Sequence, residues 1–230
     1  MSAALEHRTF EESDLVFSHA IVLPALGRDY TALVHRALDG RRERVADSLA
    51  AFVTRAEPLA QAAGMIVTTL RSGGRVLVAG NGGSAAEAQH FAGELVGRFL
   101  MERRPYAAIA LTVDSSILTA VGNDYGFDDV FARQVHALGR PGDVFVAFST
   151  SGKSPNMLRA ADAARECSMR TIAITGDLPN PLERLADVTV RCPSTHTPAT
   201  QELQMMVTHI LCEIVEAEMV ASDGERQVVS

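Results

Sequence analysis

The sequence predicts an α/β fold in which helices cover both faces of a five-stranded parallel sheet, giving three layers. Short apolar segments alternate along the chain with segments of helical periodicity, and this alternation favours a parallel sheet. The segments 75–79, 107–112 and 143–148 are largely apolar, as expected for strands buried on both faces. A glycine-rich loop and a hydroxyl-rich loop follow two of them, where open α/β sheets bind ligands. The expected strands cover 75–79, 107–112, 143–148, 170–175 and 187–191.

Helices are expected before the first strand and after the last. Apolar residues recur at helical spacing from Glu43 to about Leu70, and Pro58 favours the start of a second helix there. The last helix is expected from about Thr197 to Met219, with an apolar stripe wide enough to favour burial in an oligomer. We therefore divide the chain into a helical N-terminal extension (1–42), one domain (43–222) and a C-terminal tail (223–230).

Composition limits the class of protein. The 230 residues are 47% hydrophobic with a mean hydropathy of +0.09, which is enough to bury one substantial core. No apolar run approaches the ~20 residues of a membrane span, and no secretory apolar segment is present, so we expect a soluble, cytoplasmic protein. The net charge of −7 argues against a nucleic-acid-binding protein. Three widely spaced cysteines form no CxxC pair, which argues against a disulfide framework or a thiolate zinc site.

A glycine loop, Gly-Asn-Gly-Gly-Ser at 80–84, follows the first expected strand. Its glycines allow a tight turn and close approach to a ligand, and Ser84 is expected to cap the helix that follows. The N–H groups at such a helix start suit a phosphate or a carboxylate. Similar turns occur in α/β proteins that bind nothing there, so the loop alone leaves the ligand open.

The helix after this loop carries His90 and Glu94, which lie on one face because they are four residues apart. Gln201 and His209 lie on roughly one side of the last helix. Together the four side chains would supply two nitrogens and two oxygens to zinc or a similar divalent ion. Taken singly, each also fits a structural role, such as a buried core histidine or polarity at a helix start.

A second loop, Ser-Thr-Ser-Gly-Lys-Ser at 149–154, follows the third expected strand and precedes a helix that Pro155 can start. Four hydroxyls, backbone N–H groups and a helix N-terminus together favour a phosphate site over simple helix capping. Lys153 would add a cation beside this loop, although a solvated lysine fits the pattern equally well.

Five segments together carry a resemblance to a known family. They are Gly-Asn-Gly-Gly-Ser at 80–84, Gln-His-Phe-Ala-x-Glu-Leu at 89–95, Gly-Asn-Asp-Tyr-Gly-Phe at 122–127, Ser-Thr-Ser-Gly-Lys-Ser at 149–154, and Gln-Glu with a histidine eight residues after the glutamine at 201–209. In order and spacing, residues 43–220 resemble the sugar isomerase (SIS) domain of the phosphoheptose isomerases. The resemblance implies conversion of sedoheptulose 7-phosphate to D-glycero-D-manno-heptose 7-phosphate by a zinc-containing homotetramer, with sites at subunit interfaces.

The resemblance also implies roles for individual residues. The implied phosphate ligands are Ser149, Thr150, Ser151 and Ser154. The implied sugar site comprises Asn81, Gly82, Gly83, Ser84, Asn123 and Asp124, together with Glu94 and Gln201. The implied metal ligands are His90, Glu94, Gln201 and His209. Glu94 and His209 match the acid/base pair that an aldose–ketose shift requires, because a proton must move between C1 and C2 through an enediol.

The chain departs from the family pattern in its extension of about 40 residues, at Gln204 and at Pro198. Arg98 and either Arg103 or Arg104 are expected to reach the site of a neighbouring subunit. Two alternatives stay open. One is an isomerase of another sugar phosphate in a natural-product pathway, and the other is a non-catalytic SIS regulator resembling the replication-initiator-binding relative. Retention of all four implied metal ligands favours an enzyme.

Overall fold

The computed structural model of the protein describes residues 29–228, with side chains described to Ser222. The chain forms two compact units, with the boundary between Arg41 and Arg42. Helix α1 (Tyr30–Thr54) begins in the first unit and ends in the second. Most of the proposed N-terminal extension, residues 1–28, lies outside the described residues, as do Val229 and Ser230 of the proposed tail.

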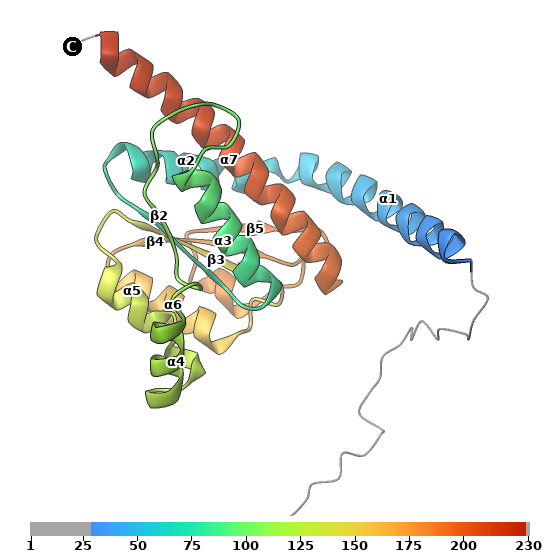
Figure 1. The fold of residues 1–230 in the computed structure, drawn as a ribbon, viewed down its shortest axis with the longest axis horizontal. Coiled ribbons are helices and arrows are strands. Elements are labelled where there is room, and N and C mark those ends of the chain that lie inside the picture. The colour runs from blue at the N-terminus through green and yellow to red at the C-terminus, as the bar shows by residue number, and fades with distance from the viewer. Residues whose placement is uncertain (1–28, 229–230) are drawn as a thin grey trace, which may run out of the picture. The chain divides into compact units, whose positions relative to one another are not determined.

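The second unit contains a five-stranded parallel sheet, as the sequence predicts (Figure 1). Its strands are β1 (Val76–Gly80), β2 (Ala108–Ala110), β3 (Val144–Ser149), β4 (Arg170–Thr175) and β5 (Val188–Arg191), in the spatial order β2-β1-β3-β4-β5. Each expected strand is present. The edge strand β2 is shorter than expected because it pairs only with residues 76–78 of β1.

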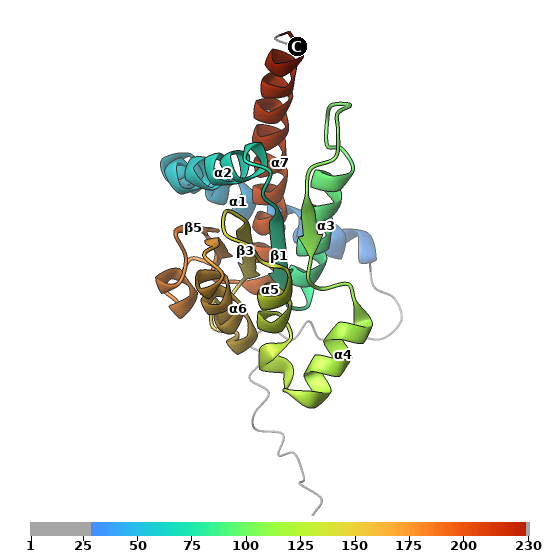
Figure 2. The ribbon, with the colours of Figure 1, turned by 90° about the vertical axis from the view of Figure 1, so that its left-hand side faces the viewer.

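Helices cover both faces of this sheet (Figures 1 and 2). Helices α2 (Ala56–Arg71), α3 (Gly83–Val96) and α7 (Thr197–Val228) share one apolar layer with alternate strand residues such as Val76 and Val78. Helices α4 (Ser115–Asp124), α5 (Ala132–Leu138) and α6 (Pro155–Glu166) lie over the residues between them, such as Leu77 and Ala79. Two short 3₁₀ turns, η2 (Phe127–Asp129) and η3 (Pro181–Arg184), complete the connections.

Some helix boundaries differ from those expected. Helix α2 begins at Ala56, so Pro58 lies within its first turn, where the missing N–H has no helical partner to lose. Ser84 does not cap α3: the helix begins at Gly83 and its N-cap, Gly82, is made without a side-chain hydrogen bond. Helix α7 continues to Val228, beyond the expected end at Met219. Helix α6 begins at Pro155, as predicted.

Among residues 29–228, no helix combines the length and the apolar character needed to cross a bilayer.

Candidate active site

The two loops predicted from the sequence lie at neighbouring strand ends. Strands β1 and β3 pair in parallel, with Gly80 opposite Phe148, so the loops that follow them emerge side by side. Strand β1 also pairs with β2 on its other edge, which makes this the point where the strand order reverses. Two amide–amide hydrogen bonds of 2.8 and 2.9 Å join Asn81 of the first loop to Asn156 at the start of α6.

The first loop needs glycine for two reasons. Gly82 has a φ of +56°, which favours glycine over residues with a Cβ. Gly83 lies under the side chain of Gln201, and a Cβ there would come within 2.1 Å of Gln201 Nε2. The loop therefore holds the Gln201 amide against the start of α3.

Three of the four residues expected to bind a metal meet between α3 and α7. The Nε2 atoms of His90 and His209 are 3.0 Å apart, and His90 Nε2 is 3.2 Å from Glu94 Oε1. One ligand atom from each of the three residues lies within 4.8 Å of the others. The ring of Phe99 stacks on His209, with the two centroids 5.5 Å apart. The predicted cluster is thus formed by one turn of α3 and the middle of α7.

The donor set of this cluster fits a divalent cation. Two unprotonated imidazole nitrogens 3.0 Å apart point lone pairs at each other, so a proton or a metal ion must lie between them to offset the repulsion. Ligand atoms about 2.0–2.1 Å from a tetrahedral zinc ion are roughly 3.3 Å apart, close to both separations here. The Gln201 amide lies at the start of α3 instead, and its role as a fourth ligand stays a prediction.

The second loop presents hydroxyls and N–H groups beside a small pocket. Ser149 is buried, and its main-chain and side-chain oxygens both accept from the N–H of Gly152. The Ser151 hydroxyl accepts from the N–H of Lys153. Thr150, Ser151 and Lys153 line a pocket of about 150 Å³. Ser154 precedes α6 and makes no side-chain cap, which leaves its hydroxyl available to a ligand.

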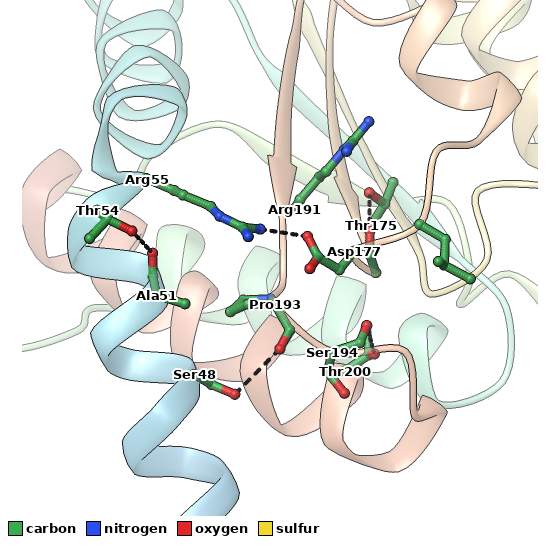
Figure 3. Close-up of polar contacts among 12 residues, drawn as sticks. Ser48, Ala51, Thr54, Arg55, Thr175, Asp177, Arg191, Pro193, Ser194 and Thr200 are labelled. Carbon is green, nitrogen blue, oxygen red and sulfur yellow. Dashed lines mark hydrogen bonds and ion pairs between the residues drawn. The ribbon is translucent and has the colours of Figure 1, made fainter.

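Asp177 also lines this pocket, and its carboxylate is fixed by an ion pair. Arg55, between α1 and α2, donates to the Asp177 carboxylate at 2.6 Å (Figure 3). The main-chain N–H of Asp177 donates to the carbonyl of Ser194, which also lines the pocket. The pocket is therefore assembled from the loops after β3, β4 and β5.

Asn123 and Asp124 do not join the histidine cluster in this chain. Both are exposed at the end of α4, and Asn123 donates to the carboxylate of Asp124. Partly buried residues of α4 pack with the α5–α6 layer, whereas His90 and His209 lie on helices of the opposite layer. Within the described part of the chain, no hydrogen bond or ion pair links Asn123 or Asp124 to the cluster.

Two buried carboxyl groups near the site were not expected from the sequence. Glu216 of α7 is 1% exposed and pairs with the side chain of Arg103 at 2.9 Å. The side chain of Arg103 is only 3% exposed, so of the arginines expected to reach a neighbouring subunit, Arg98 and Arg104 stay the prediction. Glu87 of α3 is also buried. Burial raises the pKa of Glu87 to about 7, with a smaller opposing effect from the Ser84 hydroxyl. No local pattern marks Glu87, because a single Glu between alanines usually faces solvent.

Comparison with known proteins agrees with this geometry. The SIS domain family model matches residues 42–176. A phosphoheptose isomerase of Rhodospirillum rubrum is 53% identical over 161 residues, which cover 70% of this chain and 86% of the relative. The chain belongs to the phosphoheptose isomerase family. A second family member, from Bradyrhizobium, is 46% identical and covers 90% of this chain, with 94% of its own length covered.

A solved phosphoheptose isomerase from Neisseria gonorrhoeae shares the fold. It superposes with a TM-score of 0.74 at 40% sequence identity, over 82% of this chain and all of that one. Membership of the phosphoheptose isomerase family therefore holds in both sequence and structure.

Proposed function

We propose that this chain interconverts sedoheptulose 7-phosphate and D-glycero-D-manno-heptose 7-phosphate through an enediol, with the help of a divalent metal ion. One observation carries the proposal. A chain of the phosphoheptose isomerase family brings an imidazole pair and a carboxylate together on α3 and α7, the helices that also border the glycine loop. Residues 43–222 form the catalytic domain of this proposal, between the extension (1–42) and the tail (223–230).

The residues of the cluster are suited to proton transfer between C1 and C2. Glu94 takes the proton from carbon, and His209 returns or relays a proton at the substrate oxygens. A carboxylate has two oxygens, so Glu94 can hold a cation with one and accept a proton with the other. The side chain of Glu94 is 24% exposed, so substrate can reach it.

Zinc is the proposed cofactor, with one ion per subunit held by His90, Glu94, Gln201 and His209. When bound, a divalent ion offsets the negative charge that develops on the substrate oxygens and orients them. The imidazole and carboxylate donors suit zinc, and the short separation of the two imidazoles supports a cation between them.

The remaining site residues are proposed to bind substrate. Ser149, Thr150, Ser151 and Ser154 bind the phosphate at the start of α6, where N–H groups and the helix dipole favour an anion. Asn81, Gly82, Gly83 and Ser84 border the sugar, together with Glu94 and Gln201. A phosphate in the 150 Å³ pocket would therefore lie beside the loops after β3, β4 and β5.

Asn123 and Asp124 are proposed to act on the site of a neighbouring subunit in a homotetramer. Their exposure on the opposite layer from the cluster supports this assignment. Large apolar side chains around α4 also support coverage by another copy. They are Val113, Ile117, Tyr125 and Phe127. A cytoplasmic location belongs to the same proposal, and the three free cysteines of the described chain are consistent with a reducing compartment.

A panel of five- to eight-carbon sugar phosphates tests the substrate. Conversion would be followed by NMR with zinc-loaded protein, comparing kcat/KM across the panel. The proposal predicts the highest kcat/KM for the seven-carbon ketose phosphate. A clear preference for another chain length would support an isomerase of another sugar phosphate. No conversion of any member would support a non-catalytic regulator.

A further inference from the structure

The buried carboxylate of Glu216 holds the loop that follows α3 against α7. Its Oε1 accepts from the main-chain N–H of Phe99 and from Arg103 Nε, both at 2.9 Å. Its Oε2 accepts from the main-chain N–H groups of Leu100 and Met101 at 2.6 and 2.9 Å. A carboxylate has about four acceptor sites, so this one uses all of them within a single loop. The site proposed above gives Glu216 no role.

Hydrogen bonds to this carboxylate, more than apolar packing, set the course of the loop. The side chains of Leu100 and Met101 are 64% and 38% exposed, so they contribute little burial. Glu216 itself is 1% exposed. Hydrogen bonds to a charged acceptor are strong there, because water does not compete for it. Loss of the carboxylate would therefore release the loop.

Phe99 connects the carboxylate to the histidine cluster. Its N–H donates to Glu216, and its ring stacks on His209 with 5.5 Å between the centroids and 28° between the planes. The ring also packs against the apolar layer of α2, α3 and α7. An aromatic ring held against one face of an imidazole limits the rotation of that side chain. One residue thus joins Glu216 to a proposed metal ligand.

Arg103 connects the same carboxylate to the end of α3. Its side chain is 3% exposed, and its Nη atoms donate to the main-chain carbonyls of Glu94 and Leu95 at 2.8 and 3.0 Å. Carbonyls in the last turn of a helix lack helical partners, and a cation beside them complements the helix dipole. Arg103 therefore caps α3 at Glu94, while Glu216 holds Arg103 Nε.

We propose that Glu216 is a positioning residue for the cluster, acting on His209 through Phe99 and on Glu94 through Arg103. Glu216 lies seven residues after His209, which is about two turns, so both side chains are on one side of α7. The carboxylate fixes one loop across the end of α3 and the middle of α7. This inference rests on the proposed function for its zinc and turnover readouts, and on the fold alone for the first readout below.

Three substitutions interrupt the arrangement at different points. Glu216→Gln keeps the shape of the side chain but removes the charge that Arg103 and the loop N–H groups face. Glu216→Asp keeps the charge but is one methylene shorter, so it cannot reach every donor. It carries the same comparison if Glu216→Gln does not fold. Phe99→Leu removes the stack on His209 and leaves the carboxylate in place.

Asp143→Asn is the matched control, because Asp143 is a buried carboxylate with a similar set of partners. It is 3% exposed, accepts from the main-chain N–H groups of Arg75 and Arg140 at 2.8 and 3.1 Å, and pairs with the Arg75 side chain at 3.0 Å. Asp143 precedes β3, whereas both active-site loops follow strand ends. Asp143→Asn should therefore lower stability without disturbing the cluster.

Histidine ring NMR of the metal-free protein tests the coupling without zinc or turnover. The signal of His209 is the one that His209→Gln removes, and the stacked ring of Phe99 shifts it. Phe99→Leu should move this signal, both Glu216 variants should move it as well, and Asp143→Asn should leave it in place. A His209 signal that stays unmoved in every folded Glu216 variant would overturn the proposal.

Zinc affinity measures the consequence for the proposed metal site. Each Glu216 variant should bind zinc about 10- to 100-fold more weakly than the wild type, as is typical when the support of a metal ligand is lost. Competition with a chromophoric chelator would measure this at a temperature where circular dichroism shows each variant folded. Asp143→Asn should match the wild type. An equal loss in Asp143→Asn would overturn the proposal, because it would trace the effect to stability alone.

Turnover separates positioning of the cluster from substrate binding. At saturating zinc, kcat of the Glu216 variants should fall by about tenfold or more, with a smaller change in KM, because the phosphate loop after β3 is not disturbed. A rise in KM without a loss of kcat would contradict the proposal. A wild type without zinc binding or turnover would reject only the proposed function, because the NMR comparison still decides the role of Glu216.

Discussion

The Nε2 atoms of His90 and His209 lie 3.0 Å apart, although 119 residues separate them in the sequence. The contact joins α3 to α7 at the level of Glu94, which lies 3.2 Å from the same His90 nitrogen. Two imidazole nitrogens at this distance either share a proton in a hydrogen bond or face a common cation, and the second arrangement is the one that the proposed metal site uses.

Substitution Glu94→Gln should lower kcat by about 10²–10⁴-fold, because an amide oxygen can still face a cation but cannot accept the proton from carbon. The fold should be unchanged, and circular dichroism with size-exclusion chromatography would check this. Glu213→Gln on the exposed side of α7 is the matched control. Full activity in Glu94→Gln would reject Glu94 as the base.

Substitution Ser151→Ala should weaken substrate binding more than turnover. A hydrogen bond to a charged phosphate is worth about 1–3 kcal/mol, so KM should rise roughly 5- to 150-fold. Ser72→Ala, at the exposed end of α2, removes a hydroxyl away from the pocket and should leave KM unchanged. Equal KM values for both variants would place phosphate binding elsewhere.

Substitution Gly152→Ala should distort the second loop. Gly152 has a φ of +61°, which costs a residue with a Cβ about 1–2 kcal/mol. The new methyl would also lie 2.0 Å from Asn180 Oδ1. We expect a loss of at least about 2 kcal/mol in unfolding free energy and a raised KM.

Gly64→Ala is the contrasting variant for Gly152→Ala. Gly64 is exposed within α2 and has open space where its Cβ would lie. This change should stabilise the protein by about 0.5–1 kcal/mol, because alanine loses less backbone entropy in a helix. Similar unfolding free energies for the two variants, measured in urea, would contradict the proposed clash at Gly152.

Substitution Glu216→Gln should destabilise the domain by about 3–5 kcal/mol, because it leaves the buried Arg103 without a compensating charge. Burial by itself raises the pKa of Glu216, but hydrogen bonds from the N–H groups of residues 99–101 and the charge of Arg103 outweigh it, so the net pKa is lowered.

A lowered folded-state pKa gives Glu216 a defined pH signature. Its stabilising effect is present above pH 4.5, its ordinary pKa, and is lost as the pH falls through the folded-state pKa. The difference in unfolding free energy between wild type and Glu216→Gln should therefore shrink in acid. A difference that is unchanged between pH 7 and pH 3 would contradict this account.

Local sequence was sufficient for most of the fold. Apolar runs such as Val144–Phe148 are buried on both faces of the sheet, and a short run of this kind that is followed by turn residues favours a strand. Residues at i and i+4, such as His90 and Glu94, share a helix face in any fold. These features depend on the spacing of residues along the chain, which can be read directly from the sequence.

Features that depend on distant packing were not predictable in this way. Glu87 is buried only because α7 and the end of β5 close over α3, and its neighbours in the sequence give no sign of this. Arg103 and Glu216 lie 113 residues apart in the sequence, so no local pattern marked Arg103 as the buried partner of Glu216. The second helix was expected to start at Pro58 but starts at Ala56, because proline is tolerated throughout a first turn.

The most direct test of the account is conversion of sedoheptulose 7-phosphate to the aldoheptose phosphate, followed by NMR, before and after chelation and again after zinc is restored. The account predicts turnover that falls on chelation and returns with zinc, and that does not return in His90→Ala or His209→Ala. Turnover that is unaffected by chelation in protein verified to be metal-free would contradict the role of the His90–His209 pair as a metal site.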